Sequence, residues 1–242
     1  MQAIKTTGLT KRYKNLTAVD NLNLDIQKGE LFALLGVNGA GKTTTIKMLS
    51  CLTKASDGDA FVGGYSIKTQ PNEVKRIIGV SPQETAVAPN LTVKENLELI
   101  CGIHGFSKQK TKEKVIKLCE QFGLNNVLKQ KASKLSGGYC RRVSIAMALI
   151  SEPEILFLDE PTLGLDVIAR QELWDLILCL KGKVTVILTT HYMQEAEALS
   201  DRIGIMKNGR LLAIGTADQL KQKMATDNFE NAFVAIVRED TV

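Results

Sequence analysis

The segment LFALLGVNGAGKTTTIK, residues 31–47, constrains the fold more than any other part of the chain. It begins with an apolar run, residues 31–35, that lacks polar alternation and is therefore typical of a strand buried on both faces of a sheet. Three glycines then fall within residues 36–41, and Lys42 follows directly. A buried strand that leads through such a loop into a helical segment predicts an α/β fold with a binding site at the carboxyl edge of its sheet.

The loop itself has the spacing GxxxxGK[ST] from Gly36 to Thr43. Glycines let successive backbone N–H groups surround a phosphate with no side chain in the way. The helix that starts near Lys42 directs its positive end at the same anion. Lys42 can reach the outer phosphates, and the Thr43 hydroxyl can bind Mg²⁺. The alternative is an accidental glycine-rich turn, but the place of the loop between a strand and a helix favours nucleotide binding.

A second acidic motif follows another apolar run, in EILFLDE at residues 154–160. Asp159 comes at the end of the predicted strand, where its carboxylate can hold Mg²⁺ through water. Glu160 lies one residue further on, where it can orient or deprotonate a water for attack on a γ-phosphate. Taken alone, the motif fits an ordinary polar strand end better, but its combination with the phosphate loop favours the catalytic interpretation.

The rest of the chain alternates between helical and strand patterns. VTVILTTH, residues 184–191, predicts a further buried strand. Thr92 and Glu95 have the spacing of a capping box, and Ser107 can cap the next helix. Residues 88–150 contain no convincing strand. The pattern therefore predicts a parallel sheet with a helical insertion.

The order of these motifs resembles that of the ATP-binding cassette (ABC) ATPases. LSGG, residues 135–138, lies between the phosphate loop and ILFLDEPT, as the signature of that family does, and the resemblance extends from about residue 3 to 238. It implies an α/β P-loop NTPase core with a parallel sheet, an antiparallel N-terminal β-subdomain and an inserted helical subdomain. The implied organisation of this single domain, 1–242, is a nucleotide-binding core at 1–87 and 152–220, a helical signature subdomain at 88–151, and a C-terminal tail at 221–242 with a short helix.

The same resemblance implies roles for individual residues. Tyr13 matches the aromatic residue that stacks on adenine, Gln83 matches the glutamine that contacts Mg²⁺ and the attacking water, and His191 matches the switch histidine at the γ-phosphate. Asp166 in LGLD matches the D-loop. The implied catalytic residues are Glu160, His191 and Gln83; the implied Mg²⁺ ligands are Thr43, Gln83 and Asp159. The implied ATP contacts are Tyr13, Gly36, Val37, Asn38, Gly39, Ala40, Gly41, Lys42, Thr43, Thr44, Ser136, Gly137 and Gly138.

The family mechanism places two such domains head to tail, with each ATP between the phosphate loop of one and the LSGG helix of the other. The helix after Ser136 offers a second positive N-terminus to that ATP. Binding then closes the dimer, and hydrolysis opens it again. The chain departs from the family after LSGG, where a glutamine or another polar residue is common and Tyr139 and Cys140 stand here.

Three kinds of work could be coupled to ATP. The first is that of a transporter subunit. The second is that of a soluble ABC ATPase acting on DNA or ribosomes. Relatives that act on chromosomes insert a long coiled coil, for which the short separation of Lys42 and Ser136 leaves no room, and relatives that act on ribosomes typically have two cassettes, whereas this sequence contains one. Glu160 and His191 argue against the third, a binding module that does not hydrolyse ATP. The phrases GLDVIARQELW and THYMQEAEALSDRIGIMKNGRLLAIGT resemble the drug- and antibiotic-efflux branch, so we expect an exporter of a drug, antibiotic or lipid-like substrate, with an importer subunit as the alternative.

Composition sets the expected partners and location. No apolar run reaches the roughly 18–20 residues that span a bilayer, and the N-terminus has no secretory signal. The net charge of +5, without basic patches that interleave aromatic residues, gives no indication of nucleic-acid binding. Five cysteines without a CxxC motif fit a reduced compartment. We therefore expect a cytoplasmic ATPase, peripheral to the membrane, that pairs with a second ATPase subunit, as a homodimer, and with a separate transmembrane permease.

The tail DNFENAFVAIV, residues 227–237, predicts a helix despite its apolar, strand-like content. Phe229, Phe233 and Val237 recur with helical spacing, together with two further apolar residues on the same stripe. Asp227 can cap this helix, with Glu230 completing a capping box. We expect the helix to pack against the ATPase body and to have no catalytic role.

Overall fold

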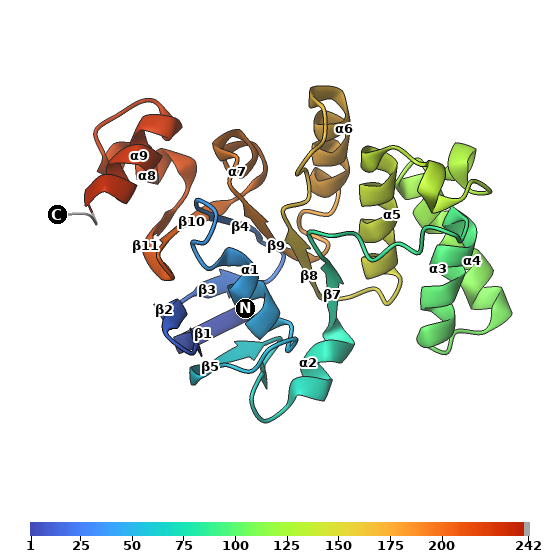
Figure 1. The fold of residues 1–242 in the computed structure, drawn as a ribbon, viewed down its shortest axis with the longest axis horizontal. Helices are drawn as coiled ribbons and strands as arrows, with labels where there is room; N and C mark the ends of the chain where they lie inside the picture. Colours follow the sequence, from blue (N-terminus) through green and yellow to red (C-terminus); the bar gives the residue numbers. More distant parts are fainter. Residues whose placement is uncertain (240–242) are drawn as a thin grey trace.

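The computed structural model describes residues 1–239, which form two sheets flanked by helices (Figure 1). The first sheet is antiparallel and lies toward the N-terminus. Its strands run in the order β2-β1-β5-β6, with β3 paired to β1. Their bounds are Gln2–Tyr13 (β1), Leu16–Leu22 (β2), Asp25–Gln27 (β3), Asp57–Val62 (β5) and Tyr65–Ser66 (β6). This sheet is the antiparallel β-subdomain that the resemblance implied.

The second sheet carries the phosphate loop and is parallel except at one edge. Its order is β11-β10-β4-β9-β8-β7, and only β11 runs antiparallel to its neighbour. The bounds are Leu31–Leu35 (β4), Ile78–Ser81 (β7), Ile155–Asp159 (β8), Thr185–Thr190 (β9), Arg202–Lys207 (β10) and Arg210–Gly215 (β11). The buried strands predicted around residues 31–35, 154–160 and 184–191 are therefore confirmed as three adjacent strands of one sheet.

The unbroken apolar runs of these central strands have a clear structural reason. In β4, Leu31 and Leu35 pack into a core shared with the helical insertion and the C-terminal helices, whereas Phe32 packs on the opposite face with the N-terminal sheet and α1 (Lys42–Leu49). β8 is divided in the same way, with Leu156 on the first face and Phe157 on the second. Because both faces of the sheet are covered, both sets of side chains must be apolar.

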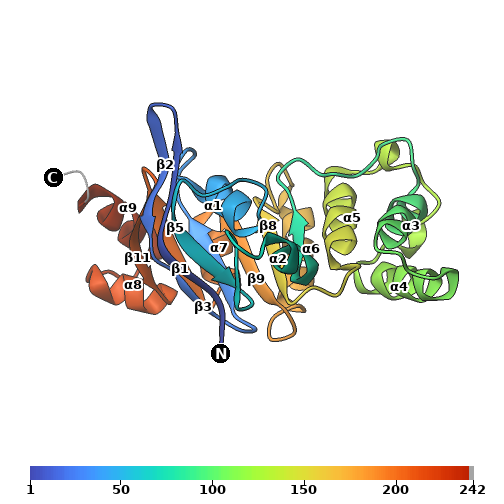
Figure 2. The same ribbon diagram turned by 90° about the horizontal axis from the view of Figure 1, so that it is seen from below.

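The helices gather at the two ends of the large sheet as well as on its faces (Figures 1 and 2). α3, α4 and α5 form one end of the molecule, and α8 and α9 form the other. None of the helices within the described residues is both long enough and apolar enough to span a bilayer. Beyond α1, their bounds are Pro71–Ile77 (α2), Val93–Ile103 (α3), Lys108–Gln121 (α4), Gly137–Leu149 (α5), Val167–Leu178 (α6), Met193–Leu199 (α7), Ala217–Lys223 (α8) and Phe229–Glu239 (α9).

Local capping signals decide where the helices of the insertion begin. The Thr92 hydroxyl accepts the Glu95 N–H at 3.2 Å, and the Glu95 carboxylate accepts the Thr92 N–H at 2.7 Å, so the predicted capping box starts α3. Ser107 accepts the Lys110 N–H at 3.3 Å and starts α4, as predicted. Between residues 88 and 151, all of which are described, no segment forms a strand. The segment is therefore helical, as its sequence indicated.

The predicted tail helix is present as α9, and its apolar stripe faces the body of the protein. Phe229, Phe233 and Ile236 are buried in the same core as the helical insertion. The predicted cap is wrong by one residue: Asn228 accepts the Asn231 N–H at 3.1 Å, in the place that was assigned to Asp227. The helix begins at Phe229, so Asn228 is the residue that precedes its first turn. With Asn231 three residues after the cap, Glu230 is not in position to complete a capping box.

Candidate nucleotide site

The glycine-rich loop connects β4 to α1 and passes close to two other backbone segments. A Cβ atom on Gly36 would lie 2.4 Å from the Met206 carbonyl oxygen, and one on Gly41 would lie 2.5 Å from the Ala18 carbonyl oxygen. Gly41 also has a φ of 102°, a value that side chains disfavour. Glycine at these two positions therefore allows the loop to close tightly at the N-terminus of α1.

Lys42 follows this loop as the first residue of α1, and its side chain is buried. Its Nζ atom donates to the carbonyl oxygens of Gly36 at 2.7 Å and Val37 at 3.3 Å. It also lies 3.2 Å from Oε1 of Glu160, which is buried as well. The ammonium is thus held inside the concave side of the loop, together with the positive end of α1, and favours binding of an anion there.

Asp159 ends β8 and forms an oxygen-rich group with two threonines. The hydroxyls of Thr43 and Thr189 donate to Oδ1 of Asp159, at 3.0 Å and 2.5 Å. The sequence analysis did not identify Thr189; its signal is the strand register, which pairs Asp159 with Thr189 across β8 and β9. Carboxylate and hydroxyl oxygens are ligands that Mg²⁺ accepts. Because the described residues contain no cluster of three or more His, Cys, Asp or Glu suited to a metal ion, Mg²⁺ here would need phosphate and water oxygens to complete its coordination.

Glu160 leaves the strand in an unusual backbone conformation. Its φ is 48°, in the left-handed region, and its N–H donates to the carbonyl and hydroxyl oxygens of Thr189, both at 3.1 Å. Its other carboxylate oxygen, Oε2, lies 2.7 Å from Nδ1 of His191, which donates to it because an ionised carboxylate only accepts. One buried carboxylate therefore contacts both Lys42 and His191. A left-handed backbone conformation such as that of Glu160 is strained, and strain of this kind is common at functional sites.

These side chains surround a cavity of about 640 Å³. Of the residues predicted from the sequence, Gln83, Glu160 and His191 line it, as do Asn38 to Thr44 of the loop. Gly36, Val37 and Asp159 are not among its lining residues. The lining residues that the sequence analysis missed are Leu16, Thr17, Ala18, Leu163 and Asn208. Most of them carry no chemical motif, so only the folded chain reveals that they lie near the loop.

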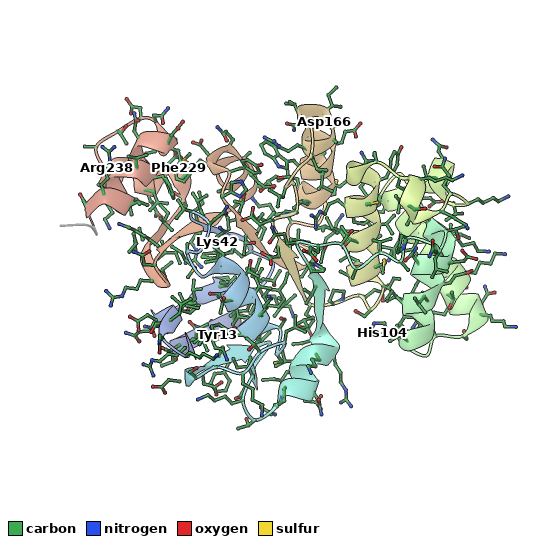
Figure 3. The ribbon with its side chains drawn as sticks, in the orientation of Figure 1. Tyr13, Lys42, His104, Asp166, Phe229 and Arg238 are labelled. Carbon is green, nitrogen blue, oxygen red and sulfur yellow. The ribbon has the colours of Figure 1, made fainter. Side chains whose placement is uncertain are left out.

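Tyr13 lies beside this cavity rather than in its wall. It ends β1 and pairs with Leu16, which does line the cavity. The ring is half-exposed, and the Lys11 ammonium lies 4.8 Å from its centroid (Figure 3). Tyr13 is therefore on the same hairpin as part of the cavity wall, and its stacking on adenine stays a prediction.

Gln83 is exposed at the cavity, but the backbone around it is firmly held. The guanidinium of Arg141 donates to the Pro82 carbonyl at 2.7 Å and to the Gln83 carbonyl at 2.8 Å. Arg141 is buried on α5, only five residues after Ser136. The sequence analysis did not identify this arginine, because the contact joins segments far apart in the chain. It ties the loop that bears Gln83 to the helix that begins at LSGG.

The LSGG residues lie away from the cavity of their own chain. Ser136 caps α5 by accepting the Tyr139 N–H at 3.4 Å, and it is exposed. Ser136, Gly137 and Gly138 are not among the lining residues of the cavity. The Tyr139 ring lies 5.3 Å from the Arg142 guanidinium, and the Cys140 thiol lies 3.6 Å from the Ala132 carbonyl oxygen.

Asp166 begins another helix, α6, and accepts two backbone N–H groups, those of Ile168 and Ala169, both at 2.9 Å. It stands at the outer end of that helix, apart from Lys42 (Figure 3). The LSGG segment and Asp166 are thus both at solvent-facing helix starts, where a second chain can reach them.

The chain is similar in sequence to known proteins. The family model described as "ABC transporter" matches residues 19–163. The chain is 40% identical to the daunorubicin/doxorubicin resistance ATP-binding protein DrrA of Streptomyces peucetius, covering 93% of this chain and 69% of DrrA. It is 38% identical to the probable multidrug ABC transporter ATP-binding protein YbhF of Escherichia coli, covering 98% of this chain but 42% of YbhF.

Solved structures show the same fold. An ATP-binding subunit of an ABC transporter superposes with a TM-score of 0.85 at 28% identity, over 97% of this chain and 99% of that one. A dimeric structure of the ATP-binding cassette MJ0796 in a post-hydrolysis state, with ADP and Pi bound, has a TM-score of 0.79 at 28% identity, over 88% of this chain and 98% of that one.

Proposed function

Because the chain belongs to the ABC transporter family, whose ATP-binding subunits bind and hydrolyse ATP, we propose that it is the motor of an exporter of drugs, antibiotics or lipid-like molecules. The observation that carries this proposal is the convergence of Lys42, Glu160 and His191 on one cavity beside a phosphate loop. The relatives named for drug resistance and multidrug transport support the direction of transport. The chain covers about two fifths of YbhF, so that relative's whole activity is not carried over.

In this proposal, the loop and Lys42 bind the phosphates of ATP. The N-terminus of α1 and the loop N–H groups complement their negative charge. Glu160 accepts a proton from the attacking water, and His191, which donates to Glu160, orients that carboxylate at the γ-phosphate. Gln83 also lines the cavity, and its proposed role is to contact the same water.

Mg²⁺ fits the donor set beside the loop. The Thr43 hydroxyl and the Asp159 carboxylate are hydrogen-bonded at 3.0 Å, so both oxygens are available in one place, and the Gln83 amide is the third proposed ligand. When bound, the ion neutralises charge on the phosphate oxygens. Removal of Mg²⁺ with a chelator should therefore abolish hydrolysis.

A second copy of the chain would complete the site. Ser136, Gly137 and Gly138 begin α5 at an exposed surface, outside the cavity of their own chain. A homodimer in the head-to-tail arrangement would bring this positive helix end to the phosphates of the other subunit's ATP. The dimeric MJ0796 cassette is a structural precedent for pairing in this family.

The transmembrane permease would dock on the loop that contains residues 83–91. Asn96 fixes this loop: its side chain accepts the Ala88 N–H at 2.8 Å and donates to the Ala88 carbonyl at 3.1 Å. Val87 packs against the core, whereas Ala86 is exposed. Ala86→Asp is therefore the better test of docking, since a charge at Val87 would also disturb the fold. Docking there would hold the chain at the inner face of the membrane, in the cytoplasm.

Inverted membrane vesicles test this function directly. Vesicles that contain the chain and its transmembrane permease should take up doxorubicin when ATP and Mg²⁺ are added outside. Vesicles with Glu160→Gln should not, and Ala86→Asp should lose uptake while keeping nucleotide binding. Uptake only in right-side-out vesicles that were loaded with ATP and Mg²⁺ would indicate an importer. ATPase activity without transport in either orientation would indicate a soluble ABC ATPase.

A further inference from the structure

Tyr192 contacts two groups: His191, which lines the cavity, and Arg170, which lies on α6. Its ring lies 4.1 Å from the imidazole of His191, between ring centroids, at an interplanar angle of 40°. The guanidinium carbon of Arg170 lies 4.7 Å from the centroid of the same tyrosine ring. Arg170, Tyr192, His191 and Glu160 therefore form a continuous series of contacts, which ends at the 2.7 Å hydrogen bond between His191 and Glu160.

Arg170 lies on α6, one turn after Asp166, and its backbone N–H donates to the Asp166 carbonyl at 3.0 Å. Its guanidinium is weakly held by other groups: one terminal nitrogen donates to the Leu165 carbonyl at 3.4 Å, and Nε is buried without a hydrogen-bond partner among the described residues. The face of Tyr192 is thus a principal contact of this cation, and contacts of this kind are attractive when partly desolvated.

A second contact keeps α6 and the segment after His191 together. Trp174, one turn further along α6 than Arg170, donates from Nε1 to the Glu195 carboxylate at 3.1 Å. The same oxygen of Glu195 accepts the Thr162 hydroxyl at 2.9 Å, and Thr162 is two residues after Glu160. The contact between Trp174 and Glu195 holds α6 and α7 side by side. A displacement at the start of α6 is therefore transmitted to the contact between Arg170 and Tyr192.

Tyr192 is not among the lining residues of the cavity, whereas its neighbour His191 is. The backbone N–H of Tyr192 donates to the Thr190 hydroxyl at 2.9 Å, which fixes the backbone of Tyr192 at the end of β9. From this geometry we propose that Tyr192 is a positioning residue for hydrolysis: it holds the His191 imidazole toward Glu160 and transmits the position of α6, and hence of Asp166, to that pair. The inference rests on the proposed roles of Glu160 and His191.

Steady-state ATPase measurements on the full chain test this role. Tyr192→Ala should lower kcat roughly 3- to 30-fold and leave KM for ATP within about twofold, since the ring acts on His191 and not on bound nucleotide. Tyr192→Phe keeps the aromatic face and should restore most of kcat. Arg170→Ala should lower kcat in the same direction. Gln194→Ala, at an exposed position two residues after Tyr192, is the matched control and should behave as wild type.

The double variant separates transmission from two local effects. If Arg170 acts through Tyr192, Arg170→Ala together with Tyr192→Ala should lose no more kcat than Tyr192→Ala alone. Multiplied losses in the double variant, or a Tyr192→Ala protein with wild-type kcat, would overturn the inference. A thermal melt of each variant identifies loss of folded protein. If Tyr192→Ala does not fold, Arg170→Ala, which changes a partly exposed side chain, decides the outcome: a lower kcat supports the inference, and a wild-type kcat overturns it.

His191→Ala distinguishes this inference from the proposed function. If His191→Ala lowers kcat and Tyr192→Ala does not, only the positioning role of Tyr192 fails. If His191→Ala has wild-type kcat, the proposed role of the histidine fails and the inference fails with it. Failure of doxorubicin uptake in vesicles, with these ATPase results as expected, would reject doxorubicin as the exported substrate and leave the role of Tyr192 intact.

Discussion

The Nζ atom of Lys42 lies 3.2 Å from Oε1 of Glu160, and both side chains are buried. The ammonium has three protons, and its other partners are two carbonyl oxygens of the loop, those of Gly36 and Val37. A phosphate that enters the loop must therefore share or replace one of these contacts. Glu160 is the only anionic partner of the three, so phosphate and Glu160 compete directly for the same positive charge.

Glu160→Gln should bind ATP more tightly and hydrolyse it more slowly. The amide removes the charge that competes for Lys42, and it also removes the proposed general base, which should lower kcat by roughly 10²- to 10⁴-fold. Calorimetry and a phosphate-release assay measure the two effects, and size-exclusion chromatography with ATP and Mg²⁺ should show a stable dimer. Glu154→Gln, at an exposed position just before β8, is the control. Full ATPase activity in Glu160→Gln would remove Glu160 from its proposed role.

Lys42→Ala should weaken ATP binding by roughly 10- to 100-fold, the value of one hydrogen bond to a charged group. Lys42 is the only lysine or arginine among the described lining residues of the cavity, so no neighbour replaces its charge. Lys47→Ala, exposed on the same helix, should bind ATP as the wild type does. Calorimetry on both variants gives the comparison, and equal affinities would contradict the assignment of the phosphate loop.

The buried carboxyl of Glu195 should make stability depend on pH. Burial raises its pKa above the ordinary value, so the native state retains this proton at pH values where the unfolded chain, with a glutamate pKa of about 4.3, has lost it. The unfolded state then binds fewer protons, and the contribution of Glu195 to stability falls as pH rises from about 4.3 to the raised native pKa.

Glu195→Gln should remove that dependence, because the amide is neutral and keeps a carbonyl acceptor for Thr162 and Trp174. Its melting temperature at pH 8 should equal or exceed that of the wild type, whereas Glu195→Ala, which leaves both donors without their acceptor, should melt lower. Identical pH profiles of melting temperature for Glu195→Gln and the wild type would show that Glu195 does not titrate in this way.

Removal of the chain after Thr226 should lower the free energy of unfolding by a few kcal/mol, since α9 buries large apolar side chains worth roughly 1.5–3 kcal/mol each. Phe229 is 3% exposed and Phe233 is 8% exposed. Affinity for ATP should change little, because α9 contributes nothing to the described lining of the cavity. Phe233→Ala should reproduce most of the loss, and Val234→Ala, on the exposed side, should not. An unchanged melt after truncation would show that the tail does not stabilise the body.

The sequence predicted the features that depend on short spacings. The glycine-rich loop, the capping box at Thr92 and the helical period of the tail each involve residues within a few positions of one another, and local geometry determines them. The tail also shows the limit of this approach: Asp227 and Asn228 are both good caps, and the sequence spacing favoured Asp227, whereas Asn228 caps the helix in the structure.

Contacts between distant segments could not be predicted in the same way. Thr189 donates to Asp159 because β8 and β9 pair in one register, and Arg141 reaches Gln83 because α5 packs beside β7. Neither residue carries a local pattern that distinguishes it from other threonines or arginines in the chain. Their partners follow from the tertiary arrangement, which a single sequence does not specify position by position.

Arg141 anchors the loop that precedes the helical insertion. Its guanidinium donates to the backbone carbonyl oxygens of Pro82 and Gln83 and not to the side chains of these two residues. Every residue type has such a carbonyl oxygen, so the anchor tolerates changes in the identity of the loop residues. Replacement of Arg141 has no comparable tolerance, because a single lysine ammonium does not match its fork of donors. The side chains of the loop can therefore change by ordinary point mutation, while its position relative to the LSGG helix stays fixed.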